Sequence, residues 1–230
     1  MKSQQLINTA GAAITMGLIV MGGMLIGSPP VHADDDDRET KVQIGFQIAP
    51  VRLNLAGKDR TLVYLGSYIV NGANDCNACH NSGVAPNFEY LPGANPYASQ
   101  RKILDPAVYL GGGQNFGKIA GPPSPDIITR NLTPNKTGRP AGGLTFAEFL
   151  QVIRHGKDFD HLHPNCSAKI TTNCMPADAG IDGNLLQIMP WPYFQAMTEH
   201  DLLAIYTYLS AIPCITGPAD PKNPLHNDCH

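Results

Sequence analysis

Apolar side chains recur at helical spacing ahead of the middle of the chain. Between Arg60 and Asn71 they fall on one helix face, which consists of Leu62, Leu65, Tyr68 and Ile69. Asp59 is placed to cap the first turn, and Asn71-Gly72 is placed to end the helix. The pattern therefore predicts a helix over residues 60–71.

A second apolar stripe lies near the C-terminus and consists of Leu202, Leu203, Ile205, Tyr206 and Leu209. Thr198-Glu-His-Asp201 resembles a capping box and Pro213 closes the segment, so a helix is predicted between them. We expect the two stripes to pack against each other. Gly66 is the candidate for the crossing point, because a residue without a side chain lets two backbones approach closely.

Two shorter segments complete the predicted elements. Thr145 and Glu148 form a capping box, which predicts a third helix that ends near His155-Gly156. In residues 42–55 apolar and polar residues alternate, which predicts a short strand or hairpin within an N-terminal leader, residues 34–58. The alternating apolar residues are Val42, Ile44, Phe46 and Ile48.

The remaining segments, 81–143 and 157–188, are long and rich in glycine and proline. A hydrophobic content of 43% with 15% charged residues is nevertheless typical of a globular protein. Long ordered loops in a compact domain are uncommon unless they surround something. The net charge of −3 provides no basic surface for a nucleic acid. We therefore expect a mostly α domain over 59–213 whose loops wrap a ligand.

Residues 1–33 have the features of a secretory signal peptide. Lys2 supplies a positive charge, an apolar stretch follows over 14–21, and Val31-His32-Ala33 matches a cleavage site. The sequence thus predicts export to the periplasm and a mature chain without a membrane span. The alternative is an uncleaved anchor over 11–27; no other stretch approaches the ~20 apolar residues that a spanning helix needs.

Export changes the interpretation of the six cysteines, which are Cys76, Cys79, Cys166, Cys174, Cys214 and Cys229. Cysteines that no cofactor uses are expected to pair in an oxidising compartment. Four of them lie outside the motif described next, and three connectivities are open to them. Proximity in the sequence favours Cys166–Cys174 and Cys214–Cys229, and the second bridge would tether a C-terminal tail, residues 214–230.

Cys76-Asn77-Ala78-Cys79-His80 has the spacing of a c-type haem attachment site. Two cysteines three positions apart can both reach the haem edge, where each thiol adds to a vinyl group. The adjacent histidine then offers its imidazole to the iron. A thioredoxin-like pair would need a βαβ setting, and a zinc or iron–sulfur site would need a second closely spaced cysteine pair. Because the motif occurs once, we predict one covalently attached haem c.

The predicted sixth ligand of the iron is Met189, in the loop before the last helix. Pro190 and Pro192 stiffen this loop, and a thioether raises the reduction potential of haem iron. Met175, which also precedes a proline, and Met197 remain alternatives, as does an open site. A histidine ligand is a further alternative, and the candidates are His155, His161 and His163.

The order of helix, C-x-x-C-H motif, loops, Met-Pro and final helix resembles class I c-type cytochromes. Several segments over residues 42–213 are similar to the cytochrome modules of bacterial periplasmic alcohol and sugar dehydrogenases. These segments are Gly66-Ser-Tyr-Ile-Val70, Arg130-Asn-Leu-Thr-Pro134, Thr145-Phe-Ala-Glu-Phe149, Met189-Pro-Trp-Pro192 and Met197-Thr-Glu-His-Asp-Leu202.

The resemblance implies a mostly α-helical fold around haem, His80 and Met189 as axial ligands, and electron transfer as the activity. The chain differs from the family in two ways, since subunits of this kind often have three modules and the cysteine pairs 166/174 and 214/229 look like local additions. Both differences leave the partner enzyme open.

Three functional hypotheses follow. The first is a periplasmic electron carrier without substrate turnover, which connects a dehydrogenase to an oxidase or another cytochrome. The alternative is a haem enzyme whose sixth site is open or displaceable and acts on a small molecule. A third hypothesis is a sensor or assembly protein that uses haem structurally.

Overall fold

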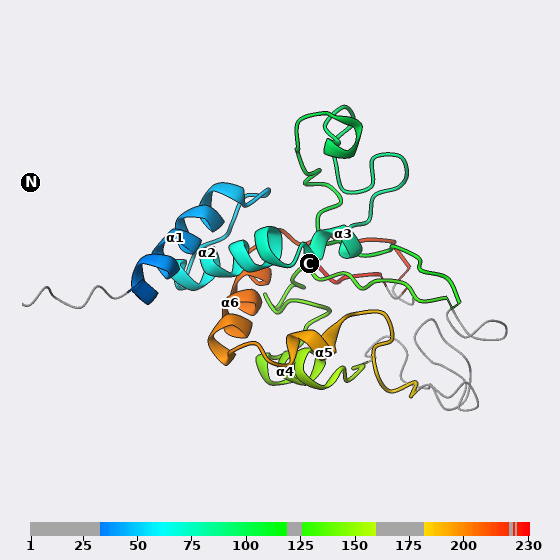
Figure 1. Ribbon diagram of the computed structural model, residues 1–230. Helices are drawn as coiled ribbons and strands as arrows, with labels where there is room; N and C mark the ends of the chain where they lie inside the picture. The colour runs from blue at the N-terminus through cyan, green and yellow to red at the C-terminus, as the bar shows by residue number, and fades with distance from the viewer. Residues whose placement is uncertain (1–32, 119–125, 160–181, 221–222, 224) are drawn as a thin grey trace, which may run out of the picture. The chain divides into compact units, whose positions relative to one another are not determined.

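Two helices pack across each other and supply much of the buried core (Figure 1). The computed structural model describes residues 33–118, 126–159, 182–220, 223 and 225–230. Helix α2 (Arg60–Tyr68) continues into the π-helical turn η1 (Ile69–Ala73), and α6 (Glu199–Leu209) packs across α2. Their apolar faces form most of the buried core, which includes Val63, Leu65, Leu202, Ile205 and Leu209. The predicted packing of the two stripes is confirmed.

The ends of these helices follow the sequence signals. The Asp59 carboxylate accepts hydrogen bonds from the backbone N–H groups of Thr61 and Leu62, and the Thr198 hydroxyl accepts one from Asp201. Both side chains satisfy N–H groups that a helix terminus leaves without partners. The helix predicted over residues 60–71 continues as η1 to Ala73, two residues beyond its predicted end.

Helix α4 (Phe146–His155) confirms the third predicted helix. Thr145 and Glu148 form the reciprocal capping box, and Gly156 ends the helix in a left-handed conformation with φ of 65°. A short helix, α5 (Trp191–Phe194), follows Met189-Pro190 and packs against α4.

The expected strand or hairpin in residues 42–55 is wrong, because Ala33–Ile48 form helix α1. Helix-supporting contacts four residues apart outweigh the alternation: Lys41 pairs with Asp37 at 2.6 Å, and Gln43 bonds Glu39 at 3.1 Å. The Gly45 carbonyl accepts a buried hydrogen bond from the Ser67 hydroxyl at 2.7 Å. This contact ties α1 to α2.

Apart from helix α3 (Cys76–His80) and the short 3-10 helix η2 (Pro96–Ala98), loops make up the rest of the described chain. They contain three isolated β-bridges, and no sheet forms among the described residues. This confirms the predicted mostly α fold with long loops. Residues 84–104 stand out from the body as a lobe beside α3 (Figure 1).

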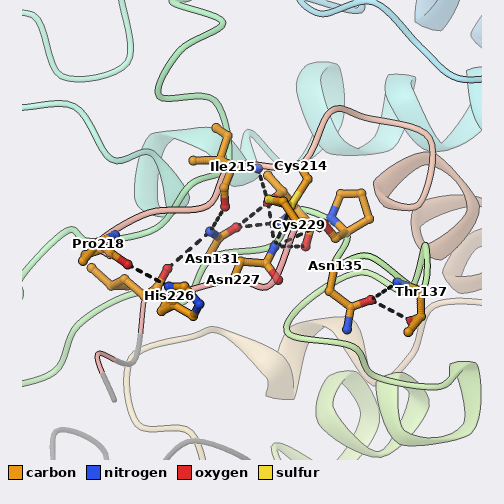
Figure 2. Close-up of a disulfide and its surroundings, with 12 residues drawn as sticks. Asn131, Asn135, Thr137, Cys214, Ile215, Pro218, His226, Asn227 and Cys229 are labelled. Atoms are coloured by element: carbon orange, nitrogen blue, oxygen red, sulfur yellow. Dashed lines mark hydrogen bonds between the residues drawn. A yellow bond between two sulfur atoms is a disulfide. The ribbon is translucent and has the colours of Figure 1, made fainter. Parts of the chain in front are cut away.

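The C-terminal tail returns to the loop that precedes α4 (Figure 2). Cys214 and Cys229 form a disulfide with Cα atoms 5.8 Å apart. The side chain of Asn227 donates to the carbonyls of Thr133 and Pro134 at 3.1 and 3.2 Å. The tail is thus held by a covalent bond and by buried polar contacts.

Some predictions lie outside the described residues. They concern the signal peptide or anchor before Ala33, the Cys166–Cys174 bridge, and the ligand candidates Met175, His161 and His163. Among the residues that are described, no helix combines the length and the apolar character needed to cross a membrane.

Candidate haem-binding site

The C-x-x-C-H motif forms helix α3. Asp75, which immediately precedes this helix, has a left-handed backbone conformation with φ of 45°. Cys76 is half-buried and Cys79 is exposed. Burial raises the pKa of the Cys76 thiol to about 12, and partial desolvation together with the nearby carboxylates of Asp75 and Glu89 raises the pKa of Cys79. Both cysteines are therefore protonated thiols at neutral pH in this structure.

His80 is prepared for a metal bond. Its Nδ1–H donates to the backbone carbonyl of Arg130 at 2.9 Å, which leaves Nε2 free. Burial lowers the pKa of His80, because desolvation disfavours the imidazolium. A neutral imidazole oriented by a carbonyl through its other nitrogen is the usual form of a histidine ligand.

One cavity of about 230 Å³ connects α3 to the opposite part of the fold. Cys76, Cys79 and His80 line one part of it, and Met189 and Met197 line another. The walls between are mainly apolar and include Val70, Leu132, Phe149, Ile153, Ile205 and Leu209. Side chains separated by more than 100 positions in the sequence therefore surround the same space.

This donor set fits a haem. Two thiols and an imidazole stand together at the cavity, thioethers line it elsewhere, and apolar walls suit a porphyrin face. His155 is exposed and is not among the residues that line the cavity, so the structure offers no support for it as a ligand.

The loop that carries Met189 is fastened to the end of α4. The N–H of Leu186 donates to the Gly156 carbonyl at 2.7 Å, and the indole N–H of Trp191 donates to the Leu186 carbonyl at 3.1 Å. The Trp191 ring lies against Gly156, where a β-carbon would collide with it. These contacts fix the loop on both sides of Met189.

Polar residues also reach the cavity. Arg130 and Asp158 line it and form an ion pair at 2.6 Å, with side chains 23% and 6% exposed. Two contacts of this site were not predicted from the sequence. One is the bond of the Arg130 carbonyl to His80, and the other is the pair of bonds by which the buried Asn77 side chain holds the motif in place. No sequence signal identified these two contacts, because their partners are distant in the chain.

Comparison with known proteins supports the resemblance to c-type cytochromes. The chain is 30% identical over 152 residues to the cytochrome c subunit of the quinone alcohol dehydrogenase from Gluconacetobacter polyoxogenes. The corresponding subunit from Komagataeibacter europaeus matches equally well. The match covers 65% of this chain but 22% of each relative, so the chain spans about a fifth of the length of these relatives. No family model matches, and no solved structure matches.

Proposed function

We propose that this chain is a c-type cytochrome that carries single electrons. One haem c would be attached through Cys76 and Cys79, with His80 and Met189 as axial ligands. The observation that carries the proposal is that Cys76, Cys79, His80 and Met189 line the same cavity. The single C-x-x-C-H motif supports a count of one haem.

Each residue would have a distinct task. The two cysteines would anchor the porphyrin edge, and His80 would offer Nε2 while the Arg130 carbonyl orients its ring. The Met189 thioether would stabilise the ferrous state, and the apolar walls would exclude water. The haem supplies the change between ferric and ferrous iron. Because His80 and Met189 would both hold the iron, electron transfer would not require a substrate at the metal.

The relatives support a dehydrogenase as partner, because both are named as cytochrome c subunits of a quinone alcohol dehydrogenase. We propose that a periplasmic dehydrogenase donates electrons to this chain and that an oxidase or another cytochrome accepts them. Gel filtration of the exported protein with a candidate dehydrogenase, followed by reduction kinetics, tests this pairing.

Haem attachment is tested by intact mass under denaturing conditions. The exported protein should carry the mass of one haem that acidic organic solvent does not extract. Replacing Cys76 or Cys79 with alanine should weaken or abolish attachment. Extraction of the haem from the wild-type protein would contradict the proposal.

The sixth ligand is tested by Met189→Ala, with Met197→Ala as the matched control in the same cavity. Loss of Met189 should remove the weak near-red absorption band of methionine-ligated ferric haem and let carbon monoxide bind. M197A should retain the band. The reverse result would make Met197 the ligand. Ready carbon monoxide binding by the wild-type protein would favour the alternative, a haem enzyme with an open or displaceable sixth site.

A further inference from the structure

The side chain between the two cysteines is held by two opposite partners. Asn77 is 1% exposed, and its Oδ1 accepts a hydrogen bond from the backbone N–H of Leu110 at 2.8 Å. Its Nδ2 donates to the carboxylate of Glu89, also at 2.8 Å. A backbone N–H can only donate and an ionised carboxylate can only accept, so these partners define the orientation of the amide.

The Asn77 contacts join the attachment motif to two separate loops. Leu110 belongs to the segment that follows the 84–104 lobe, and Glu89 belongs to the lobe itself. Ala78, the other residue between the cysteines, is exposed and has no side-chain hydrogen-bonding group. Of the two side chains between the thiols, that of Asn77 therefore joins this peptide to distant loops, while the Asn81 side chain donates to the carbonyls of Asn77 and Ala78 from the end of the same segment.

Glu89 is an unusual partner, because it is 4% exposed and buried carboxylates are costly unless they are paired. It accepts a hydrogen bond from the Asn77 amide at 2.8 Å. Among the described residues no lysine, arginine or histidine forms an ion pair with it. The Asn77 amide therefore stabilises this carboxylate next to the motif.

We propose that Asn77 and Glu89 form a buried pair that positions the haem-attachment peptide, and that the charge of Glu89 lowers the reduction potential of the attached haem. This inference rests on the proposed haem attachment. A buried negative charge favours the ferric over the ferrous state, since the ferric site carries one more positive charge. Low-dielectric surroundings weaken this effect less than water would.

Two substitutions of Glu89 separate its charge from its hydrogen bond. Glu89→Gln keeps an acceptor oxygen for Asn77 and removes the charge. It should attach haem as the wild type does and show a more positive reduction potential in a redox titration. Glu89→Ala removes the acceptor as well and should also lose part of the haem content, measured by intact mass. Asn77→Ala should lose haem in the same way, because the Leu110 contact is broken too.

Glu39→Gln is the matched control, since it removes the same charge from the exposed face of α1. Its potential and haem content should equal those of the wild type, because solvent and salt screen an exposed charge. An unchanged potential in E89Q would overturn the electrostatic role. Full haem content in both E89A and N77A would overturn the positioning role. A wild-type protein without bound haem would instead refute the proposed function, so the two failures are distinguishable.

Discussion

At the scale of single residues, Gly66 determines how closely the central helices approach. A β-carbon there would collide with the carbonyl of Ala204 and with the Cβ of Tyr208. A β-carbon on Gly72 would instead lie 3.2 Å from Cδ1 of Ile48, which is the flexible end of that side chain. Neither glycine needs a left-handed backbone, so the two positions differ mainly in the space available.

We expect Gly66→Ala to destabilise the protein by about 1–3 kcal/mol, because an overpacked crossing must open. Gly72→Ala should cost less, since Ile48 can move aside. Urea unfolding followed by circular dichroism measures both. Helix propensity favours alanine over glycine at both positions, so equal stabilities of the two variants would show that the close crossing at Gly66 does not determine the effect.

At the scale of elements, the Met189 loop depends on the contact between Gly156 and Trp191. Gly156 has φ of 65°, a conformation that costs other residues about 1–2 kcal/mol. Gly138 has φ of 75° and open space around it. The two glycines therefore have similar backbones and different surroundings.

Gly156→Ala should lower the free energy of unfolding by about 1–3 kcal/mol more than Gly138→Ala does, because the added methyl group overpacks against Trp191. It should also weaken the methionine absorption band of the haem protein, because the loop carrying Met189 moves. Unfolding curves and ferric spectra of both variants test this. An intact band in G156A would mean that the loop is held without Trp191.

The C-terminal tail is the second element whose contribution can be measured. Replacing Cys214 and Cys229 with alanine should cost about 3 kcal/mol, as expected for a closed loop of 15 residues. Asp228→Asn is the control, since it breaks only the exposed contact with Lys136 at 2.6 Å and should change stability little. Thermal unfolding compares them; equal melting temperatures would show that the tail contributes no stability through its disulfide.

At the scale of the whole molecule, a buried polar ring joins three distant segments. The Tyr109 hydroxyl donates to Asn71, the Asn71 amide donates to Tyr208, and the Tyr208 hydroxyl then donates to Tyr109 at 2.8 Å. Burial raises the pKa of Tyr109 well above its ordinary value, and burial also raises that of Tyr208. Both hydroxyls stay protonated in the folded state.

Because both hydroxyls keep their protons when the protein is folded, we expect the free energy of unfolding to fall at alkaline pH. An unfolded tyrosine ionises near pH 10, whereas these two retain their protons at that pH when folded, so unfolding releases protons. Their contribution is complete below about pH 10 and is lost as the pH rises towards their folded pKa values, by about 1.4 kcal/mol per pH unit for each proton released. Urea unfolding between pH 9 and 11 should show a shallower decline in Tyr208→Phe. An identical slope would contradict the linkage.

Local signals predicted helices α2, α4 and α6, while α3 and α5 were not predicted and the segment of α1 was predicted as a strand or hairpin. Asp59, Thr145 and Thr198 act on N–H groups two or three residues away, so their effect can be deduced from spacing alone. The prediction of a strand or hairpin in the N-terminal segment was wrong because it relied on only four alternating apolar residues. Contacts four residues apart and the docking of Gly45 on α2 determined its helical form.

The sequence by itself determined the chemistry of the proposed site, because the two cysteines and the histidine of the attachment motif are neighbours in the chain. It also placed Met189 among several candidate ligands. Only the tertiary structure decided which of the described candidates line the cavity with His80, and which groups hold the motif. Asn77 meets partners 12 and 33 residues away, and His80 meets one 50 residues away. Contacts at such separations depend on how loops return to the core, and no local pattern of residues encodes that path.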